Sequence, residues 1–284
     1  MPTADDDQEA LRYVACHPGS ALCTIVAIDG SFSRELGAQL AVGLDGTTTG
    51  SLADGCLEQE LASQVASLRG TGTRVLRFGK GSPFIDFRLP CGSGLDILID
   101  TAPNYDAIKQ TVNRLDARHS ALLELPVSDK SHLRTRHYVP ALHILVFGNG
   151  PEADWLERIS AGAGIVTEVI RPEQGLSLGR APACRFADLW TAVVLLFHDH
   201  EWERSILDWA LATDAFYIGA IGGAAARTNR RESLRELGWD KSSVDRVRGP
   251  VGLIPRTRHA RALGLSILAE IVGIYERQRN LPFP

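Results

Sequence analysis

Two cysteines of this chain stand beside glycine in segments that could carry out thiol chemistry. Cys56 follows Gly55, and Cys91 precedes Gly92. Glycine lets the backbone approach a ligand closely and leaves the neighbouring thiol uncrowded. Cys56 also opens a predicted helix, whose N-terminus favours a thiolate that could bind a metal, carry a persulfide or attack an electrophile. A small buried thiol is the alternative for Cys56, because free cysteines are often buried.

A second candidate site lies where glycines follow a predicted strand. Gly148 and Gly150 belong to the sequence Gly-Asn-Gly-Pro-Glu-Ala, which fits the G-x-G-x-x-A fingerprint of dinucleotide-binding folds. The first glycine permits a tight turn, and the second admits a phosphate to the free N–H groups of the next helix. The following strand ends in Ile170 and Arg171 instead of the acid that holds a ribose. The segment therefore indicates phosphate binding more strongly than the use of NAD.

Two further segments follow predicted strands of the same half. His198 begins the sequence His-Asp-His, at the carboxyl end of a strand, where parallel sheets bind ligands. Its side chains could transfer protons, but neighbours in a turn often point apart, so no metal site is expected. Capping of the next helix by Asp199 or His200 is the alternative. Gly219 and Gly222 lie at another predicted strand-to-helix junction. Arginines that could clamp an anion, or form a solvated helix face, follow at positions 227, 230 and 231.

The elements that position the two glycine-flanked cysteines predict an α+β domain over residues 1–128. Apolar or β-branched runs indicate strands, and apolar residues at helical spacing indicate helices. The strands expected are 21–28, 39–44, 74–78 and 95–100, and the helices are 11–20 and 57–68. Residues 108–125 could form a helix or a strand. The polar, basic segment 129–139 is expected to be a linker.

From residue 140 to residue 284 the pattern alternates between strand and helix. This alternation predicts a Rossmann-like domain, with a parallel sheet and right-handed crossovers. The strands expected are 142–147, 165–170, 192–197 and 215–218, and the helices are 152–161, 201–212, 225–237 and 259–277. The last helix is expected to bury Leu263, Ile267, Ile271 and Ile274. The fold class expected for the whole chain is therefore α/β, with an N-terminal α+β domain and a C-terminal Rossmann-like domain.

Net charge and cysteine content exclude several classes of protein. The 284 residues carry a net charge of -4, which argues against general binding to nucleic acids or anionic membranes. No apolar run approaches the roughly 20 residues that cross a bilayer. Five cysteines, an odd number at no zinc-finger spacing, indicate reduced thiols in the cytoplasm. Cys16, Cys23 and Cys184 lack neighbouring glycine and are expected to be structural.

Taken together and in order, these segments resemble the XdhC/CoxI family, whose members serve molybdenum hydroxylases such as xanthine dehydrogenase. Residues 28–38 resemble the family's V-x-G-S-S-P-R-x-x-G-A, residues 50–58 its G-S-V-S-G-G-C-V-E, and residues 91–94 its C-G-G segment. The segments that match the family's second half are 145–150, 198–200, 217–223, 250–253 and 265–270. The resemblance covers nearly the whole chain.

The resemblance implies an accessory chaperone more than a catalyst, with no catalytic residues. Such a chaperone binds molybdenum cofactor (molybdopterin) as cargo and helps deliver its sulfurated form to a xanthine-dehydrogenase-type hydroxylase. The partners implied are the molybdenum hydroxylase apoenzyme, a cysteine desulfurase and a second copy of the chain in a homodimer. The cofactor-binding residues expected are Cys56, Cys91, Gly55, Gly92, Gly148, Gly150, His198, Gly219 and Gly222.

The chain departs from the family pattern at Asp54 and Ile170, which replace a glycine and an acid, and over residues 254–262. A carboxylate close to a thiol disfavours the thiolate and repels an anionic ligand. Asp54 therefore predicts that Cys91 matters more than Cys56 for cofactor affinity. The alternative is that Asp54 points outward and caps the helix.

Two other functions stay open on the sequence. The glycine turn and Arg171 would suit an NAD(P)-dependent oxidoreductase, although the missing acid and the lack of an obvious catalytic base weigh against it. The departures would also suit a non-catalytic interaction protein whose cofactor site has decayed.

Overall fold

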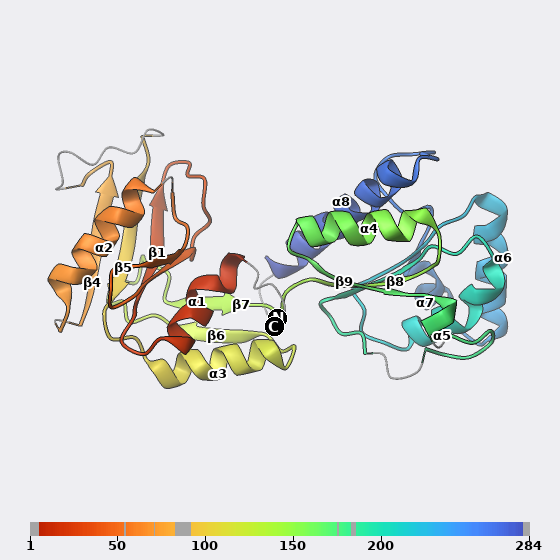
Figure 1. The fold of residues 1–284 in the computed structure, drawn as a ribbon, viewed down its shortest axis with the longest axis horizontal. Helices are drawn as coiled ribbons and strands as arrows, with labels where there is room; N and C mark the ends of the chain where they lie inside the picture. Colours follow the sequence, from red (N-terminus) through yellow and green to blue (C-terminus); the bar gives the residue numbers. More distant parts are fainter. Residues whose placement is uncertain are drawn as a thin grey trace. The chain divides into compact units, whose positions relative to one another are not determined.

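The computed structural model describes residues 6–53, 55–70, 72–82, 92–174, 176–182 and 186–280. Asp54, Cys91 and Cys184 lie outside the described residues. The chain divides into two compact units, the first ending at Pro140 and the second beginning at Ala141 (Figure 1). The predicted α/β class is confirmed, because the first unit combines an antiparallel sheet with helices and the second contains a parallel sheet. None of the described helices is long and apolar enough to cross a membrane.

An antiparallel sheet of five strands forms the centre of the first unit, in the order β3-β2-β1-β5-β4. Its strands are β1 (Ala21–Asp29), β2 (Gln39–Val42), β3 (Thr48–Gly50), β4 (Thr73–Gly79) and β5 (Gly94–Asp100). Successive side chains of a strand point to opposite faces. Both faces of this sheet are buried, since Cys23 and Ile25 of β1 belong to one apolar cluster and Leu22 to another.

Helices cover both faces of this sheet (Figure 1). Helix α2 (Cys56–Leu68) covers the face of Cys23 with Leu57, Leu61 and Val65, which recur at helical spacing. The opposite face is covered by α1 (Asp6–Cys16), α3 (Tyr105–Asp116) and the antiparallel pair β6 (Ala121–Glu124) and β7 (Thr135–Tyr138).

Three elements of the first unit differ from the sequence-based expectation. Helix α1 begins at Asp6, and not at residue 11, because Gln8 and Ala10 belong to its buried face. Residues 108–125 contain parts of both a helix and a strand. Residues 129–139 were expected to be a linker, but they include β7, which pairs with β6 and buries Tyr138. Its polar side chains concealed the strand, because the pairing is made by the backbone.

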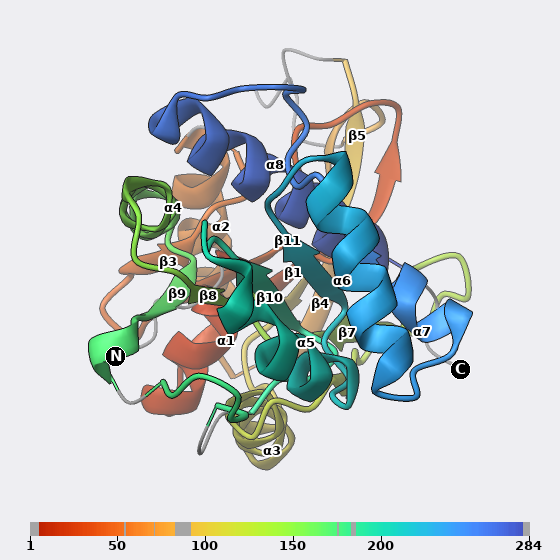
Figure 2. The same cartoon turned by 90° about the vertical axis from the view of Figure 1, so that its right-hand side faces the viewer.

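The second unit is built on a parallel sheet of order β12-β11-β10-β8-β9. Its strands are β8 (His143–Phe147), β9 (Val166–Ile170), β10 (Thr191–Leu195), β11 (Tyr217–Ala220) and β12 (Val247–Arg248). Its helices are α4 (Pro151–Gly162), α5 (Glu203–Leu211), α6 (Ala224–Glu236), α7 (Lys241–Asp245) and α8 (Ala260–Arg279), with short 3-10 turns η1 (Pro172–Gln174) and η2 (His200–Trp202). Helices α4 and α8 lie on one side of the sheet, and α5 and α6 lie on the other (Figure 2).

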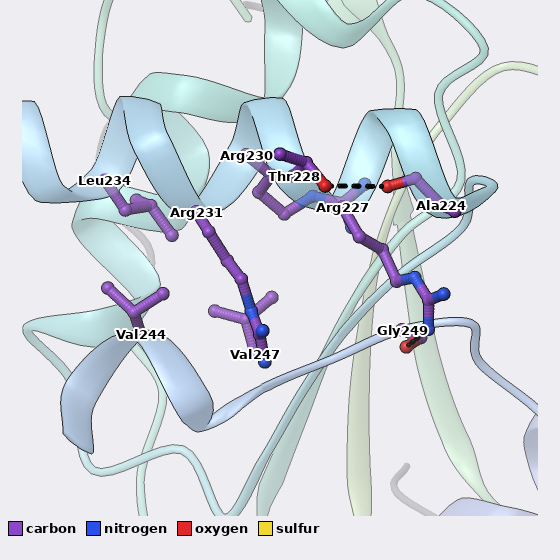
Figure 3. Close-up of a pocket in the computed structure, with 9 residues that line it drawn as sticks. All are labelled: Ala224, Arg227, Thr228, Arg230, Arg231, Leu234, Val244, Val247 and Gly249. Atoms are coloured by element: carbon purple, nitrogen blue, oxygen red, sulfur yellow. Dashed lines mark hydrogen bonds between the residues drawn. The ribbon is translucent and has the colours of Figure 1, made fainter. Parts of the chain in front are cut away.

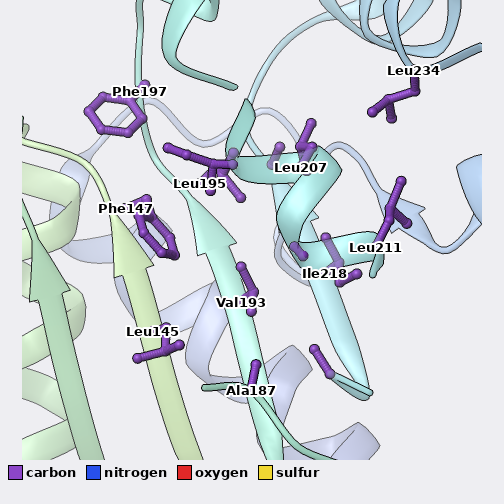
Figure 4. Close-up of a cluster of buried hydrophobic side chains, with 14 of the residues drawn as sticks. Leu145, Phe147, Ala187, Val193, Leu195, Phe197, Leu207, Leu211, Ile218 and Leu234 are labelled. Carbon is purple, nitrogen blue, oxygen red and sulfur yellow. The ribbon is translucent and has the colours of Figure 1, made fainter. Parts of the chain in front are cut away.

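The core under α5 and α6 comes from alternate residues of the central strands. Leu145 and Phe147 of β8 and Val193 and Leu195 of β10 pack there with Leu207 of α5 (Figure 4). All five side chains are buried. The strands read as continuous apolar runs in the sequence because both faces of a parallel sheet are covered.

Helix α8 buries Ile267 and Ile271 as predicted, whereas Leu263 and Ile274 are only half-buried. Gly264 explains the difference, because a Cβ added there would lie 3.0 Å from the backbone nitrogen of Leu156 in α4. The close approach of the two helices turns the buried stripe of α8 toward Gly264.

Candidate functional site

Three connections of the first unit emerge at one end of its sheet. The end of β1, the end of β4 and the start of β5 pair with one another, and the end of β3 pairs with the start of β2. The loops that follow β1, β3 and β4 therefore leave the sheet at the same end. The loop after β3 leads into α2 at Cys56, and Gly92 lies on the loop after β4, whereas Cys91 lies outside the described residues.

Cys56 is the first residue of α2, and its free thiol is exposed. The buried alternative for this thiol is therefore wrong. Gly55 before it has a φ of 95°, and, apart from its two chain neighbours, no heavy atom of the described residues lies within 4 Å of the place where its Cβ would be. This backbone conformation suits glycine, and the space before the thiol is open. The binding of a cofactor by Cys56, Gly55 and Gly92 stays a prediction.

Glu58 holds the loop before Cys56 in place. Its Oε1 accepts hydrogen bonds from the N–H groups of Leu52 (2.8 Å) and Ala53 (2.6 Å), and its Oε2 accepts one from Gly55 (2.8 Å). Burial would raise the pKa of Glu58, but these N–H groups and its own together hold that pKa below its usual value. Sequence reasoning missed this role, although a glutamate three residues after a helix N-cap has the spacing of a capping box.

A guanidinium lies beside the same loop. Nη2 of the exposed Arg34 donates to Ser51 Oγ at 3.0 Å, and Ser51 Oγ donates to the carbonyl oxygen of Ala53 at 3.1 Å. Arg34 belongs to the loop between β1 and β2 and so connects two of the three loops at this end of the sheet. Guanidinium groups bind anions such as phosphate with paired hydrogen bonds. Sequence reasoning did not single out Arg34, because contact with Ser51 depends on the pairing of distant strands.

The other described cysteines differ from Cys56. Cys23 is completely buried in β1, and burial, with a smaller effect of the Asp100 carboxylate, raises its pKa to about 12. This thiol is a packing residue, as predicted. Cys16 is exposed at the end of α1, three residues before Gly19.

The glycine turn of the second unit lies at the switch point of its sheet. Strands β9 and β10 lie on opposite sides of β8, so the carboxyl ends of β8 and β10 border the position where such sheets bind ligands. A Cβ added to Gly148 would lie 3.0 Å from the carbonyl oxygen of Leu196. Gly148 therefore lets the chain after β8 approach the chain after β10.

A carboxylate occupies the second half of this turn. A Cβ added to Gly150 would lie 2.5 Å from Glu152 Oε2 and 3.8 Å from His198 Nε2. Glu152 Oε1 lies 3.7 Å from His198 Nε2, and Glu152 Oε2 is buried with no hydrogen-bond partner among the described residues. Dinucleotide-binding folds place a pyrophosphate at this helix N-terminus. The negative charge of Glu152 opposes such a ligand here.

The residues that would hold the ribose of a dinucleotide are also absent at the described end of β9. Ile170 is buried with 1% of its surface exposed, where an acid would hold a ribose. Arg171 Nη2 pairs with Asp154 Oδ1 of α4 at 2.7 Å. Arg171 therefore has a carboxylate partner within its own unit, and the basis for an NAD(P) site is weak.

The His-Asp-His segment follows β10 as predicted. The His198 side chain is 72% exposed, and Asp199 Oδ1 accepts a hydrogen bond from the Glu201 N–H at 3.0 Å. Asp199 therefore caps the turn η2, as the alternative interpretation expected. Within the described part of the chain, no group of three His, Cys, Asp or Glu residues is placed to hold a metal ion.

Gly219 and Gly222 have different roles. Gly219 lies in β11, one residue before the strand ends at Ala220, so it belongs to the strand that leads into the predicted junction with α6. A Cβ there would lie 2.6 Å from Tyr217 Cε1 and 2.7 Å from Val251 Cγ1, so close packing accounts for the glycine. Gly222 lies in the loop between β11 and α6, where it was expected.

The arginines of α6 border a cavity of about 270 Å³ that α7 and β12 also line (Figure 3). Arg230 is buried and donates to both carboxylate oxygens of Glu203 at 2.9 Å. Arg231 pairs with Asp245 at 3.0 Å. Arg227 Nη1 donates to the carbonyl oxygen of Gly249 at 2.9 Å. Two of the three arginines are therefore neutralised by carboxylates, which weakens the case for an anion clamp here.

Comparisons with known proteins identify the family. The profile of the XdhC Rossmann domain matches residues 144–271, and that of the XdhC and CoxI family matches residues 17–79. The molybdenum cofactor insertion chaperone PaoD of Escherichia coli K12 is 31% identical over 97% of this chain and 91% of its own length. This chain belongs to the XdhC and CoxI family. The predicted resemblance is thereby confirmed.

Two further proteins are similar to this XdhC and CoxI family member at lower identity. A probable xanthine dehydrogenase subunit of Bacillus subtilis 168 is 21% identical over 91% of this chain and 94% of its own length. A crystal structure described as a xanthine dehydrogenase of Bacillus halodurans has a TM-score of 0.73 and 19% identity. The match covers 99% of this chain and 98% of the solved chain. At this identity the similarity shows the fold alone.

Proposed function

We propose that this XdhC/CoxI-family protein binds molybdenum cofactor as cargo and inserts it into a xanthine-dehydrogenase-type molybdenum hydroxylase. The observation that carries the proposal is the similarity to PaoD, a molybdenum cofactor insertion chaperone, at 31% identity over 97% of the chain. The match extends over both units, so it includes the Cys56 loop and the Rossmann-like sheet together. We assign the protein the role of a chaperone and not that of a catalyst.

We place cargo binding at the end of the first sheet that carries Cys56 and Gly92. The thiol of Cys56 is exposed, Glu58 fixes the loop before it, and Arg34 supplies a positive charge. Molybdopterin carries a phosphate and a dithiolene, both of which are anionic and suit the guanidinium of Arg34. In the second unit, His198 and Gly222 stay candidate contacts at the ends of β10 and β11. Gly148 and Gly150 stay candidates for a part of the cargo other than its phosphate, because Glu152 opposes an anion at their turn.

We further propose that the cargo is delivered in its sulfurated form, with a cysteine desulfurase as a second partner and a homodimer as the working state. The exposed Cys56 thiol supports a role close to the sulfur of the cargo. Co-purification with a desulfurase and sedimentation analysis of the pure protein test these two assignments separately. A strictly monomeric protein that still delivers cofactor would remove the homodimer from the proposal.

The experiment that tests the function measures retention and transfer together. Purified protein is incubated with free molybdenum cofactor, separated from unbound cofactor, and added to a cofactor-depleted hydroxylase. We expect retention of pterin and molybdenum and recovery of hydroxylase activity. Cys56→Ala should reduce retention, whereas Cys16→Ala, which removes another exposed thiol, should not. No retention and no recovery with the wild-type protein would exclude the proposed function.

Two alternatives give different results. An oxidoreductase would bind NADPH, and we expect no fluorescence change on titration because Glu152 occupies the turn and Arg171 is paired. An interaction protein with a decayed site would tolerate replacement of Cys56 and Cys91 without any cellular consequence.

A further inference from the structure

A cavity of about 360 Å³ lies in the first unit, between the sheet and the layer formed by α3 and β6. Its lining includes residues at the start of β1 and β4 and at the end of β5, which is the opposite end of the sheet from the loop before Cys56. A volume of this size falls within the range of small-molecule sites. The residues that line it and are used below are Leu22, Thr73, Leu98, Asp100, Ile108 and Leu125.

A buried carboxylate forms part of the cavity wall. Asp100 is only 7% exposed, and it lies between Leu22 of β1 and Thr73 of β4 in one row across three strands. Asp100 Oδ1 accepts a hydrogen bond from the N–H group of Ala102 at 3.1 Å. Among the described residues, no ion pair and no second hydrogen bond reaches this carboxylate. Asp100 therefore retains capacity to accept hydrogen bonds from a ligand.

The cavity wall around Asp100 combines apolar side chains with the polar residues Thr24 and Asn104 and a second, exposed carboxylate, Glu124. Leu98 and Ile108 are each 1% exposed, and Leu125 is 7% exposed. Burial raises the pKa of Asp100, and the hydrogen bond from Ala102 compensates only in part. A positively charged donor in the cavity would favour the ionised carboxylate, whereas an anion would be repelled.

We propose that this cavity binds a small organic cation whose nitrogen donors pair with Asp100 and whose apolar body packs against the leucine and isoleucine side chains. An amine or an amidine meets this description, because two parallel N–H groups match the two oxygens of a carboxylate. The site does not depend on the proposed chaperone function, since it lies at the other end of the sheet and uses none of the candidate cargo residues.

Benzamidine is the probe for this site, with benzoate and benzamide as anionic and neutral compounds of the same shape. Binding to the full-length protein is measured by calorimetry, and amide NMR shifts identify the site. We expect benzamidine to bind, and benzoate to bind at least tenfold more weakly. We also expect benzamidine to shift the amide NMR signals of Leu22 and Leu98. Asp100→Asn should weaken benzamidine binding about tenfold or more, since it replaces a charge-assisted hydrogen bond with a neutral one.

Asp116→Asn is the matched control, because it removes an exposed carboxylate of the same unit, 54% exposed in its pair with Arg12. It should leave benzamidine binding unchanged. Leu125→Trp, which fills the cavity and keeps the carboxylate, should also weaken binding.

Benzamidine affinity should decrease as pH falls and Asp100 takes up a proton. No binding at millimolar benzamidine, or equal binding by wild type and Asp100→Asn, would overturn the proposal. Cofactor retention by Asp100→Asn should equal that of the wild type, which separates this test from that of the chaperone function.

Discussion

The loop before the exposed Cys56 thiol is held by the carboxylate two residues further along the chain. Glu58 accepts hydrogen bonds from Leu52, Ala53 and Gly55, and so fixes the loop that precedes the thiol. Each of these N–H groups would lack its partner if the carboxylate were removed. A buried donor without a partner costs about 1–3 kcal/mol. Glu58 is thus a stability residue placed directly beside the candidate cargo site.

Glu58→Gln should lower the free energy of unfolding at pH 7 by about 1–3 kcal/mol, because an amide accepts fewer and weaker hydrogen bonds. The folded-state pKa of Glu58 lies below its ordinary value of 4.5, so its contribution is present above pH 4.5 and is lost as pH falls through the folded-state pKa. The difference between variant and wild type should therefore shrink in acid. Urea unfolding at pH 7 and at a pH below the folded-state pKa of Glu58 measures this difference. Glu60→Gln, which changes another glutamate of α2, is the control. A difference that is equal at both pH values would contradict the account.

The described cysteines should react with iodoacetamide in a fixed order. Cys56 and Cys16 are exposed and should be alkylated in the native protein, whereas Cys23 is completely buried with its pKa raised to about 12. Mass spectrometry of peptides from native and urea-unfolded protein measures the extent of labelling. Rapid labelling of Cys23 without denaturant would mean that β1 is not packed as described.

The two glycine-flanked cysteines should contribute unequally to cofactor affinity. Asp54 precedes Cys56 by two residues, and a carboxylate close to the thiol would repel an anionic cargo. Cys91→Ala should therefore weaken retention more than Cys56→Ala, and Asp54→Gly should tighten it. Asp54 and Cys91 lie outside the described residues, so retention assays decide the ranking. A larger loss from Cys56→Ala would show that the ranking is wrong.

At the scale of elements, α5 and α6 are joined by one buried ion pair. Arg230 and Glu203 side chains are 5% and 4% exposed and meet at 2.9 Å, and Arg230 also donates to the carbonyl oxygen of Ile221. Removing one partner leaves a buried charge without compensation, which costs about 3–5 kcal/mol. The arginine that the sequence suggested for anion binding is therefore a link between two helices.

Glu203→Ala should lower the free energy of unfolding by about 3–5 kcal/mol, and Glu203→Leu combined with Arg230→Met should recover much of that loss. The exposed pair of Arg204 and Glu236 provides the control, since Glu236→Ala should cost about 1 kcal/mol or less. Thermal and urea unfolding measure all of these variants. Equal effects at the two pairs would contradict the burial of Arg230.

The sequence predicted most elements because their burial is periodic, but not those set by distant pairing. Helix α2 follows from the spacing of Leu57, Leu61 and Val65, and the parallel sheet follows from apolar runs that alternate with helices. Strand β7 was missed because its partner β6 supplies backbone hydrogen bonds that its polar side chains do not indicate. The position of the Glu152 carboxylate beside Gly150 was also missed, because it depends on the three-dimensional path of the chain at the start of α4.

At the scale of the whole molecule, family membership and site chemistry support the same function. The match to PaoD includes both units, and the first unit presents a thiol and a guanidinium at one end of its sheet. The second unit keeps the Rossmann-like sheet but places Glu152 at its glycine turn. This combination favours cargo binding over NAD(P)-dependent oxidoreduction.

The most direct test of the central claim is the transfer of molybdenum cofactor from this protein to a cofactor-depleted hydroxylase. The protein is loaded with cofactor, freed of excess, and mixed with the apoenzyme, and hydroxylase activity and molybdenum content are followed with time. We predict that activity and molybdenum appear together in the hydroxylase and that Cys56→Ala transfers less than Cys16→Ala. A wild-type protein that retains no cofactor and restores no activity would contradict the account.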